Sequence, residues 1–447
     1  MALTGVEIFK LLPKTNCKKC GFPTCLAFAM KLAQRQASLD LCPDVSDEAR
    51  QKLGEASAPP VRPIVLGSGE KAVKMGEETV LFRHDKRFVN PCAFALEIKD
   101  TLTDAEIKQK VAEVIHSEID RVGQKLRIEA IALVNDSADE GRFASAASVV
   151  ASDAPAVPVI LCTANPQTAE SALKIFPDKK PVICGMNSDN IEAMAALAKS
   201  WKATPGVSAK GLDELVQLTE KAKALGIEDM VIDSGGRTAK EILEHNTLIR
   251  RSAVKKNFKP LGYPVITFAQ RENTLLETLI AAIGIAKYSS IIVLSSIEQW
   301  KTLALFTLRQ NIYTDPQVPM QVEQKIYKIG EPTPTSPLFI TTNFSLTYFI
   351  VSGEIENSKT PGHLAVMDCE GLSVLTAWAA GKFTASKIAQ FIQESGVENE
   401  IRHKELIIPG YVAILSGALE DKLEGWKITV GPREANGISA FLKSKHQ

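Results

Sequence analysis

The chain has 447 residues, enough for about two to four domains. Its 52 lysines and arginines equal its 52 aspartates and glutamates, so it lacks the basic surplus that is typical of nucleic-acid binding. The most apolar window, 279–296, is interrupted by Lys287 and by polar residues 288–290, which predicts a helix, a turn and a strand and excludes a membrane span. The first residues lack a charged segment followed by a long apolar core, so we expect no signal peptide, no membrane partner and a cytoplasmic location.

Four of the eight cysteines lie within the first 42 residues, at the spacing C-x2-C-x4-C-x16-C. They are Cys17, Cys20, Cys25 and Cys42. Four thiolates at such a spacing can bind one metal centre. Zinc sites more often show two C-x2-C pairs or histidine ligands, and the first 83 residues contain no histidine. The spacing therefore favours a 4Fe–4S cluster, with zinc as the alternative.

The cysteines belong to a small helical module. A capping box at 4–7 predicts a helix that ends at Leu12, and Pro23 begins a second helix. Cys25 falls in the first turn of that helix, where free N–H groups and the positive end of the helix dipole favour a thiolate. Ser46 can cap a third short helix that ends near residue 53.

The middle of the chain repeats a strand followed by a helix. After a Pro-rich linker at 58–63 and hairpin strands within 64–82, helical stretches such as 103–122, 188–200 and 236–253 separate short apolar runs. The eight strand-like runs are 93–98, 128–134, 157–162, 181–184, 204–208, 230–232, 264–268 and 291–294. Eight consecutive βα units predict a (β/α)8 TIM barrel.

A second Pro-rich segment, 315–337, separates the barrel from a shorter α/β pattern. Strands are expected at 338–341, 364–368, 406–408 and 426–430, and helices at 345–352, 371–380, 385–395 and 411–423, with a last helix ending the chain. Alternation over this length predicts a small doubly wound, Rossmann-like sheet. The predicted domains are a 4Fe–4S cluster domain (1–57), a linker and hairpin (58–92), the TIM barrel (93–314), a linker (315–337) and a cofactor-binding domain (338–447).

Four βα turns of the C-terminal domain, at 341–344, 368–373, 409–410 and 431–434, are rich in small and polar residues. In an open α/β sheet such turns share the edge where ligands bind. They suit a large, flat cofactor with polar amide groups at its rim, although ordinary connecting turns have a similar composition. A dinucleotide or a nucleoside triphosphate is poorly supported, because neither G-x-G-x-x-G nor a P-loop is present.

Polar residues also follow several barrel strands, where barrel sites are built. Their side chains could hydrogen-bond a pterin ring, or they could cap the helices that follow. These residues are Asn135, Asp136, Asn165, Asn187 and the stretch Asp233-Ser234-Gly235-Gly236-Arg237. We find no Ser/His/Asp or Cys/His set, so no catalytic residue is assigned.

A C-x2-C-G-x3-C…C-P module, then a barrel, then a small Rossmann-like domain is a rare order. It resembles the large (gamma) subunit of the corrinoid/iron–sulfur protein of the reductive acetyl-CoA pathway, the acetyl-CoA decarbonylase/synthase gamma subunit family. The resemblance covers the whole chain. Its most specific parts are 14–21, 23–25 with Cys42, 341–343 and 370–376.

The resemblance implies a methyl-group carrier that is not catalytic alone, so whether it counts as an enzyme stays open. Corrinoid cobalt(I) would accept a methyl group from methyltetrahydrofolate through a separate methyltransferase and donate it to acetyl-CoA synthase. The 4Fe–4S cluster would reductively reactivate cobalt(II). The implied partners are the small (delta or beta) subunit in a heterodimer, the methyltetrahydrofolate methyltransferase, CO dehydrogenase/acetyl-CoA synthase and a ferredoxin-like electron donor.

The resemblance also assigns site residues. The cluster ligands would be Cys17, Cys20, Cys25 and Cys42. The corrin contacts, which rest on turn location as much as on the family pattern, would be Thr341, Thr347, Glu370, Gly371, Leu372, Ser373, Thr376, Gly431, Pro432 and Arg433. Neither His363 nor His403 lies in a D-x-H-x-x-G motif, so we expect a base-off corrinoid (a cobalamin-type cofactor) without an axial histidine.

Two other functions stay open at the sequence level. In one, the barrel binds a methyl-pterin and the chain is itself a pterin-dependent methyltransferase. In the other, the chain is an iron–sulfur electron-transfer or scaffold subunit. A visible absorption spectrum separates the methyl carrier from the electron-transfer subunit, because in the carrier a corrinoid band must accompany the iron–sulfur shoulder.

Overall fold

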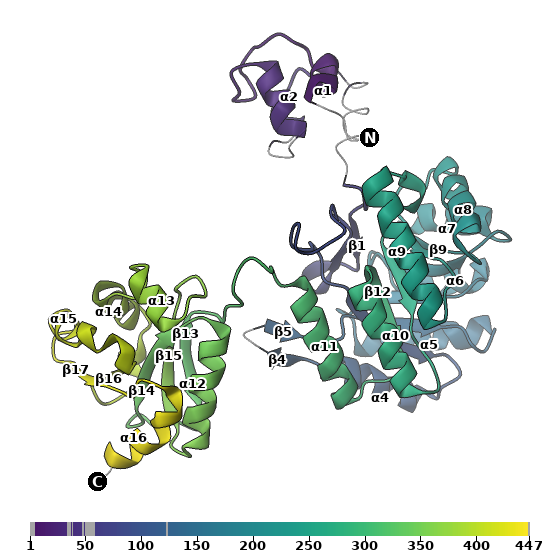
Figure 1. The fold of residues 1–447 in the computed structure, drawn as a ribbon. Helices are drawn as coiled ribbons and strands as arrows, with labels where there is room; N and C mark the ends of the chain where they lie inside the picture. Colours follow the sequence, from purple (N-terminus) through teal and green to yellow (C-terminus); the bar gives the residue numbers. More distant parts are fainter. Residues whose placement is uncertain are drawn as a thin grey trace. The chain divides into compact units, whose positions relative to one another are not determined.

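The computed structural model describes residues 5–33, 37, 39–46, 49, 59–121 and 124–445 (Figure 1). The chain divides into two compact units, each of which is described by itself. One consists of Met1–Glu118 and Arg127–Tyr313, and the other of Ile119–Leu126 and Thr314–Gln447. Within the described residues, no helix is both long and apolar enough to cross a membrane.

The cysteine-rich module contains two short helices, α1 (Gly5–Leu11) and α2 (Cys25–Ala33), and the 3-10 turn η1 (Leu39–Leu41). The predicted start of the second helix is confirmed, because the Thr24 side chain accepts a hydrogen bond from the Ala27 N–H at 3.0 Å. Ser46 likewise accepts from the Ala49 N–H at 3.2 Å. The predicted capping box begins at Thr4, and that residue and most of the third helix lie outside the described residues.

The predicted barrel is confirmed as a closed barrel of parallel strands, in the spatial order β10-β11-β12-β3-β6-β7-β8-β9. Its strands are β3 (Ala93–Lys99), β6 (Ala130–Val134), β7 (Val159–Cys162), β8 (Val182–Met186), β9 (Thr204–Ser208), β10 (Val231–Asp233), β11 (Val265–Phe268) and β12 (Ser289–Leu294). The surrounding helices are α4 (Asp104–Ile115), α5 (Glu140–Asp153), α6 (Pro166–Leu173), α7 (Ile191–Trp201), α8 (Leu212–Ala224), α9 (Ala239–Lys256), α10 (Thr274–Ala286) and α11 (Gln299–Tyr313) (Figure 1). The apolar window 279–296 is thus the end of α10, a turn and β12, as predicted.

A short hairpin closes the amino end of the barrel. Its strands β1 (Ile64–Leu66) and β2 (Val73–Met75) are antiparallel, and their apolar side chains join the core inside the barrel. Between them, the Gly67 N–H donates to the carbonyl of Lys180, just before β8, at 3.1 Å. A Cβ on Gly67 would lie only 2.8 Å from Pro158, so the close approach requires glycine. Because the hairpin fills the amino end, the carboxyl end of the barrel is the end left for a site.

The predicted helix 103–122 is wrong at its end, since α4 stops at Ile115. The antiparallel pair β4 (Ile119–Arg121) and β5 (Gln124–Leu126) follows it. Ser117 explains the break, because its buried hydroxyl donates to the Val114 carbonyl and accepts from the Ile128 N–H, at 2.7 and 2.9 Å. Side-chain bonds of this kind compete with continuation of the helix.

The C-terminal unit contains a five-stranded sheet in the order β13-β15-β14-β16-β17. The strands β14 (Leu338–Thr342), β15 (Gly362–Met367), β16 (Glu405–Ile408) and β17 (Lys427–Val430) are parallel, and β13 (Lys325–Ile329) is an antiparallel edge. One face packs on α12 (Ser345–Asn357) and α16 (Ile438–Lys445). The other packs on α13 (Val374–Ala379), α14 (Ala385–Glu394) and α15 (Ser416–Glu420) (Figure 1).

Three local predictions in this unit are wrong. The edge strand β13 lies inside the segment predicted as a linker, because its proline-rich flanks hide a short alternating pattern. The helix α12 continues past Gly353, since Ile355 is fully buried and this burial outweighs the cost of about 1 kcal/mol of a helical glycine. In place of the predicted helix 411–423, the chain forms the 3-10 segment η5 (Gly410–Leu415), which the non-helical backbone of Val412 interrupts, and then the short helix α15.

A buried ion pair holds the loop that follows β12. Lys301 of α11 and Glu277 of α10 are both fully buried, and their charged atoms lie 3.3 Å apart. Glu277 also accepts hydrogen bonds from the N–H and the hydroxyl of Ser295, and Lys301 donates to the hydroxyl of Ser296 at 2.7 Å. Each charge therefore depends on the other for its stability in the core.

We predict that Lys301→Ala lowers the free energy of unfolding by about 3–5 kcal/mol, because it leaves the Glu277 carboxylate buried without its cation. Urea denaturation followed by circular dichroism measures this loss. The control is Lys174→Ala, which removes an exposed pair with Glu170 and should change the free energy by less than about 0.5 kcal/mol. Equal effects of the two substitutions would contradict the prediction.

Candidate cofactor sites

Asn16 ties the first cysteine loop to the start of α2. Its side-chain oxygen accepts a hydrogen bond from the Cys25 N–H at 2.8 Å, and its own N–H lies 3.4 Å from the Cys25 sulfur as a donor. Cys25 is buried in the first turn of α2, as predicted. Asn16 therefore fixes the Cys25 sulfur from two sides, through the backbone of Cys25 and through the sulfur itself.

The loop before α2 has an unusual backbone. Lys14, Asn16 and Lys18 have positive φ angles of 58°, 49° and 63°, which are uncommon for residues with a side chain. Gly21 follows with φ 83°, and a Cβ there would meet no atom within 4 Å. Glycine is therefore favoured at position 21 by the left-handed backbone, and not because a side chain would collide with a neighbour. Loops of this kind turn N–H groups toward a shared anion, as in many Fe–S sites.

The four N-terminal thiols are free and lie near one another. Burial raises the pKa of Cys42, and the neighbouring Cys20, Cys17 and Cys25 raise it further. Across the part of the chain that the structure describes, no three His, Cys, Asp or Glu side chains lie close enough to hold a single metal ion. The four thiols thus lie in one region of the module, but they are farther apart than the ligands of a single metal ion.

One cation is held beside these thiols. Lys19 forms an ion pair with Asp44 at 3.0 Å, and this pair raises the pKa of Lys19. The same carboxylate lies 3.7 Å from the Cys17 sulfur, which donates to it. The lysine therefore spans the two ends of the cysteine segment, where it can offset the charge of thiolates.

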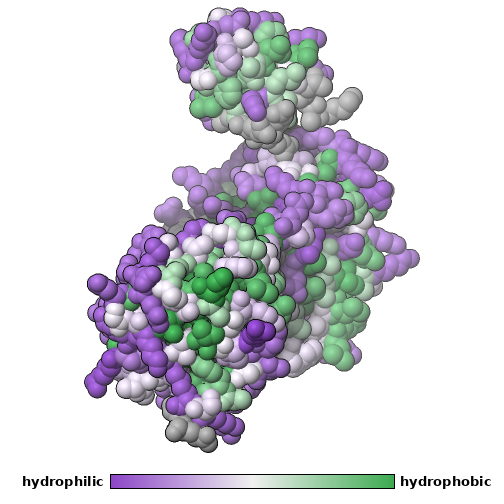
Figure 2. Space-filling model, turned by 60° about the vertical axis from the view of Figure 1, so that its left-hand side comes forward, coloured by the Kyte–Doolittle hydropathy of each residue, from purple (hydrophilic) through white to green (hydrophobic). Residues whose placement is uncertain are grey.

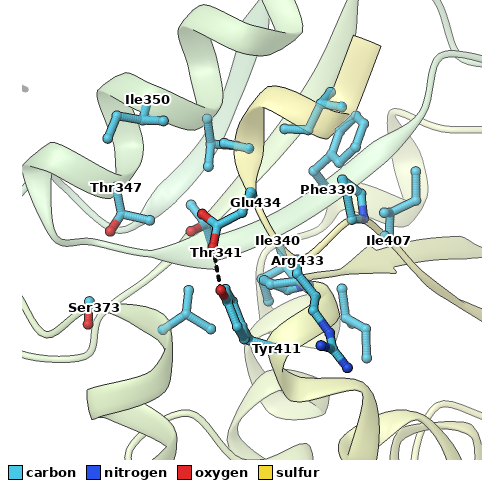
Figure 3. Close-up of a pocket in the computed structure, with 18 of the residues that line it drawn as sticks. Phe339, Ile340, Thr341, Thr347, Ile350, Ser373, Ile407, Tyr411, Arg433 and Glu434 are labelled. Atoms are coloured by element: carbon cyan, nitrogen blue, oxygen red, sulfur yellow. Dashed lines mark hydrogen bonds between the residues drawn. The ribbon is translucent and has the colours of Figure 1, made fainter. Parts of the chain in front are cut away.

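The C-terminal unit has a cavity of about 300 Å³ at the carboxyl ends of β14, β16 and β17 (Figure 3). The strands β14 and β16 are neighbours, and the chain order of the sheet reverses between them. Such a reversal opens a crevice, because the connections on either side leave toward opposite faces of the sheet. Six predicted corrin contacts line this cavity: Thr341, Thr347, Ser373, Gly431, Pro432 and Arg433.

The other four predicted contacts shape the neighbouring turn without lining the cavity. Glu370 pairs with Lys382 and, like Gly371, has a left-handed backbone, with φ 56° and 71°. Leu372 packs against the core of the sheet. The hydroxyl of Thr376 lies 3.0 Å from that of Ser373, which does line the cavity.

Asn343 connects two of the turns that form this edge. It is buried, and its side-chain oxygen accepts from the N–H groups of Cys369 and Gly371 at 2.9 and 3.0 Å. Its side-chain nitrogen donates to Asp368 at 2.9 Å. The turn after β14 therefore fixes the turn after β15, which explains an amide side chain at this position of the sequence.

Sequence reasoning missed the apolar wall of the cavity and one polar pair. Tyr411 donates a hydrogen bond to the Glu434 carboxylate across the cavity mouth, and this bond raises the pKa of Tyr411 (Figure 3). The apolar sequence of α12, in which Phe349 and Ile350 are exposed, could have indicated this apolar wall from the sequence. The missed residues are Phe339, Ile340, Ile350, Val351, Val374, Leu375, Ile407, Ile408, Pro409, Tyr411, Glu434, Ala435 and Ile438.

A buried hydroxyl in the cavity wall has no hydrogen-bond partner. Thr341 is 1% exposed, and its side-chain oxygen bonds to no group of the described chain. A buried hydroxyl without a partner costs about 1–3 kcal/mol. The neighbouring Thr342 is equally unpartnered, but it does not line the cavity. Thr341 is therefore a polar group available to a ligand.

Glycine at position 410 permits a close contact between two cavity turns. A Cβ on Gly410 would lie 2.6 Å from the Gly431 carbonyl oxygen and 2.8 Å from the Arg433 N–H nitrogen. Any larger residue would push the turn after β17 away from the turn after β16. Glycine at positions 410 and 431 thus lets the two turns pack closely together at the bottom of the crevice.

The surface around this unit is unusually apolar. Hydrophobic side chains gather on the face of the C-terminal unit that comes forward in Figure 2. Exposed large apolar residues of α12, α13 and η5 are Leu346, Phe349, Ile350, Leu375, Trp378, Tyr411 and Ile414. Gathered apolar residues of this kind typically mark a ligand or partner surface.

A second cavity, of about 470 Å³, lies at the carboxyl ends of the barrel strands. Asn135, Asp233 and Arg237 of the predicted polar set line it, whereas Asp136, Asn165 and Asn187 do not. Asn165 caps α6 by accepting from the Gln167 N–H, and Asn187 accepts from the Asp189 N–H, both at 2.9 Å. Asp136 pairs with Lys99 at 3.4 Å. The capping interpretation therefore holds for Asn165, whereas Asn187 forms a local turn and Asp136 an ion pair.

The sequence matches known families over nearly its whole length. Residues 63–442 match the family described as CO dehydrogenase/acetyl-CoA synthase delta subunit, and residues 12–43 match a family described as an Fe–S cluster. The chain is 47% identical over 444 residues to the corrinoid/iron–sulfur protein large subunit of Moorella thermoacetica, covering 99% of both chains. It is 35% identical over 455 residues to the acetyl-CoA decarbonylase/synthase complex subunit gamma of Methanothermobacter thermautotrophicus, again covering 99% of both.

The chain belongs to the family of corrinoid/iron–sulfur protein large subunits and acetyl-CoA decarbonylase/synthase gamma subunits. The resemblance seen in the sequence is therefore confirmed. The Fe–S family match contains all four N-terminal cysteines, and the longer match contains both the barrel and the C-terminal cavity.

Among solved structures, part of the chain is similar to dihydropteroate synthases. The enzyme from Vibrio fischeri has a TM-score of 0.38 and 15% identity, covering 56% of this chain and 97% of that chain. The enzyme from Xanthomonas albilineans has a TM-score of 0.37 and 12% identity, covering 53% of this chain and 99% of that chain.

We predict that Thr341→Val stabilises the protein prepared without a bound cofactor by about 1 kcal/mol, because it removes a buried hydroxyl that has no partner. Thr342→Val should have the same effect for the same reason. Urea denaturation of the cofactor-free protein measures both. Thr267→Val is the opposite control, since that buried hydroxyl bonds to Ser289 at 2.7 Å and its loss should destabilise. Destabilisation by all three substitutions would refute the prediction.

Proposed function

We propose that this chain is a methyl carrier that binds a corrinoid in its C-terminal unit and a 4Fe–4S cluster in its N-terminal module. The observation that carries the proposal is the cavity at the order reversal of the C-terminal sheet, with the unpartnered Thr341 hydroxyl in its wall. Family membership supports it, because the relatives are named corrinoid/iron–sulfur protein and acetyl-CoA decarbonylase/synthase subunits.

The cavity residues fit a corrinoid, which is a flat ring with amide groups at its rim. Thr341 offers a buried hydroxyl, Ser373 and Thr347 offer further hydroxyls, and the glycines of the turns leave room because no side chain projects from them. When bound, the corrinoid would supply a cobalt centre that accepts a methyl group from methyltetrahydrofolate through a methyltransferase and passes it to acetyl-CoA synthase. The protein would hold the ring, exclude water from its buried face through Phe339 and Ile340, and leave the other face open.

The proposed base-off state rests on where the two histidines that the structure describes in this unit lie. His363 is at the start of β15, and His403 precedes β16, whereas the cavity is at the carboxyl ends of these strands. Burial lowers the pKa of His363, which keeps it neutral, and His403 bonds to the Ser336 carbonyl at 2.8 Å. Both rings are therefore at the opposite end of the sheet from the proposed corrinoid.

The N-terminal thiols fit a 4Fe–4S cluster better than a single ion. All four are cysteines, they influence one another electrostatically, and Asn16 and Lys19 provide an N–H donor and a cation beside them. The cluster would supply single electrons that return oxidised cobalt to its reactive state. Domains of this size usually need a metal centre or another cross-link, because their apolar core is small. A cluster would supply that cross-link here.

We further propose the domain limits 1–57, 58–92 and 93–314, followed by a doubly wound, Rossmann-like corrinoid domain that begins near residue 320, earlier than the predicted 338, and extends to residue 447. Its parallel strands have the order β15-β14-β16-β17, with helices on both faces, which supports this class. The strand β13 extends the domain toward residue 320, because Val322 donates to the Asn343 carbonyl at 2.9 Å. The short segment 315–319 would then be the connection to the barrel.

The proposed partners follow from the chemistry of a carrier. A small (delta or beta) subunit would form the heterodimer, a methyltetrahydrofolate methyltransferase would load the methyl group, and CO dehydrogenase/acetyl-CoA synthase would receive it. A ferredoxin-like protein would donate electrons to the cluster, and all of this would take place in the cytoplasm. The apolar surface around the C-terminal cavity supports protein partners there.

We predict that cleavage at a specific protease site inserted between Gln317 and Val318 releases a C-terminal fragment that retains the corrinoid. The neighbouring residues 316–319 are exposed and precede every strand of the C-terminal sheet. Cobalt content of the two fragments, separated by size exclusion from cleaved holoprotein, measures this. Thr341→Val should lower the cobalt retained, and Thr342→Val should not. Cobalt that stays with the barrel fragment would overturn the assignment.

We predict that Cys20→Ala leaves methyl transfer from pre-reduced protein intact and abolishes reactivation of the cobalt(II) form, because the cluster would act only in repair. Methyl transfer and reductive reactivation are assayed separately on the same preparation. The matched control is Cys92→Ala, a buried thiol in the barrel, which should spare both activities. Loss of methyl transfer in folded Cys20→Ala protein would contradict the repair role.

A further inference from the structure

The barrel cavity is not used by the proposed methyl carrier. Residues from seven of the eight strands line it at their carboxyl ends, and the hairpin of β1 and β2 closes the opposite end of the barrel. Its volume of about 470 Å³ is within the range of small-molecule sites. The charged residues that line it are Glu97, Asp233, Arg237 and Arg271.

The charge of Arg237 is already compensated. Its two terminal nitrogens donate to the two carboxylate oxygens of Asp233 at 2.9 and 2.7 Å, a bidentate pair. Its guanidinium also lies over the ring of Phe268, 5.1 Å from the centroid. Arg237 is therefore fixed in position and neutralised, and it forms part of the wall.

The charge of Arg271 is compensated only weakly, because Glu277 and Glu241 raise its pKa as separate charges and not as ion-pair partners. One of its terminal nitrogens donates to the neighbouring Gln270 carbonyl, and the other is buried and bonds to nothing in the described chain. No described carboxylate forms an ion pair with it. Burial lowers the pKa of Arg271, and repulsion from Arg237 lowers it further. A guanidinium in this setting is costly unless an anion joins it.

We propose that the barrel mouth binds a small ligand through a carboxylate or phosphate group held by Arg271. An oxygen of either group can accept a hydrogen bond from the unpartnered nitrogen, and its negative charge compensates the guanidinium. The neutral polar side chains of Ser208 and Gln270 line the same cavity and can orient the rest of the ligand. The apolar ring of Phe268, held by Arg237, gives it a flat contact.

Glu97 limits what the far end of the ligand can be. It lies on β3, two strands from β11 in the barrel, and burial raises its pKa. A second anionic group placed near it would be repelled. The ligand therefore carries its anionic group at the Arg271 end and a neutral or hydrogen-bond-donating group at the other.

The test is isothermal titration calorimetry of the holoprotein with inorganic phosphate and, separately, with acetate, at constant ionic strength set by chloride. We expect saturable binding of at least one oxyanion, with the preferred one identifying the source as phosphate or carboxylate. Arg271→Ala should weaken this binding by about tenfold or more, and Arg271→Lys by less, since lysine keeps the charge without the planar fork.

The matched control is Arg251→Ala, which removes an exposed arginine of α9 and should leave the affinity unchanged. Arg433→Ala is a second control, because it removes the cation of the C-terminal cavity. Absence of saturable binding of either oxyanion to the unmodified protein would overturn the proposal. Unchanged affinity in folded Arg271→Ala protein, or a loss found only in Arg433→Ala, would overturn it as well.

Discussion

The reversal of chain order between β14 and β16 is the constraint on which the proposed cofactor site depends. Two adjacent parallel strands there send their connections to opposite faces of the sheet, so no connection covers the edge between them. The crevice collects Thr341 from the end of β14 and Gly431 from the turn after β17. Gly410 allows the turn after β16 to approach the turn after β17, and Asn343 fixes the turn after β15. The polar residues of this edge are thus placed by topology and by a few close contacts, and their spacing in the sequence follows from both.

The N-terminal module must stabilise a loop of unusual backbone conformation with only a small apolar core. Its apolar core is built on Ile8, Phe28 and Leu32 and also includes the buried sulfurs of Cys25 and Cys42. Three non-glycine residues hold a left-handed backbone within five positions, which is costly in an isolated loop. Such strain is tolerated when the surrounding contacts over-determine the loop, and a cluster bonded through four cysteines would do so. The metal centre and the fold of this module are then one stabilising unit.

Much of the architecture could be predicted from the sequence, and the failures share a physical cause. The eight barrel strands are short apolar runs buried on both sides, so composition alone marks them. By contrast, β13 is an edge strand, and β4 and β5 form a small exposed hairpin, so neither has a strong apolar signal. The continuation of α12 depends on the burial of Ile355 against the sheet, a tertiary contact that propensity cannot show. At the C-terminal cavity, glycine and threonine positions could be placed from turn chemistry, whereas the pairing of Tyr411 with Glu434 joins residues from two different turns.

The exposed apolar surface of the C-terminal unit also has a physical cause. A carrier must shield a reactive centre from water and still present it to more than one protein, so it cannot bury that centre under its own chain. Side chains such as Leu346, Phe349 and Trp378 stay partly exposed in this chain. Their contact with water is unfavourable, and a protein without partners would gain nothing from exposing them. A partner that covers them recovers that free energy on docking, and a second partner can recover it in turn. Under the proposed function, exchange between partners would need no large rearrangement of the sheet, because the same surface would serve each of them.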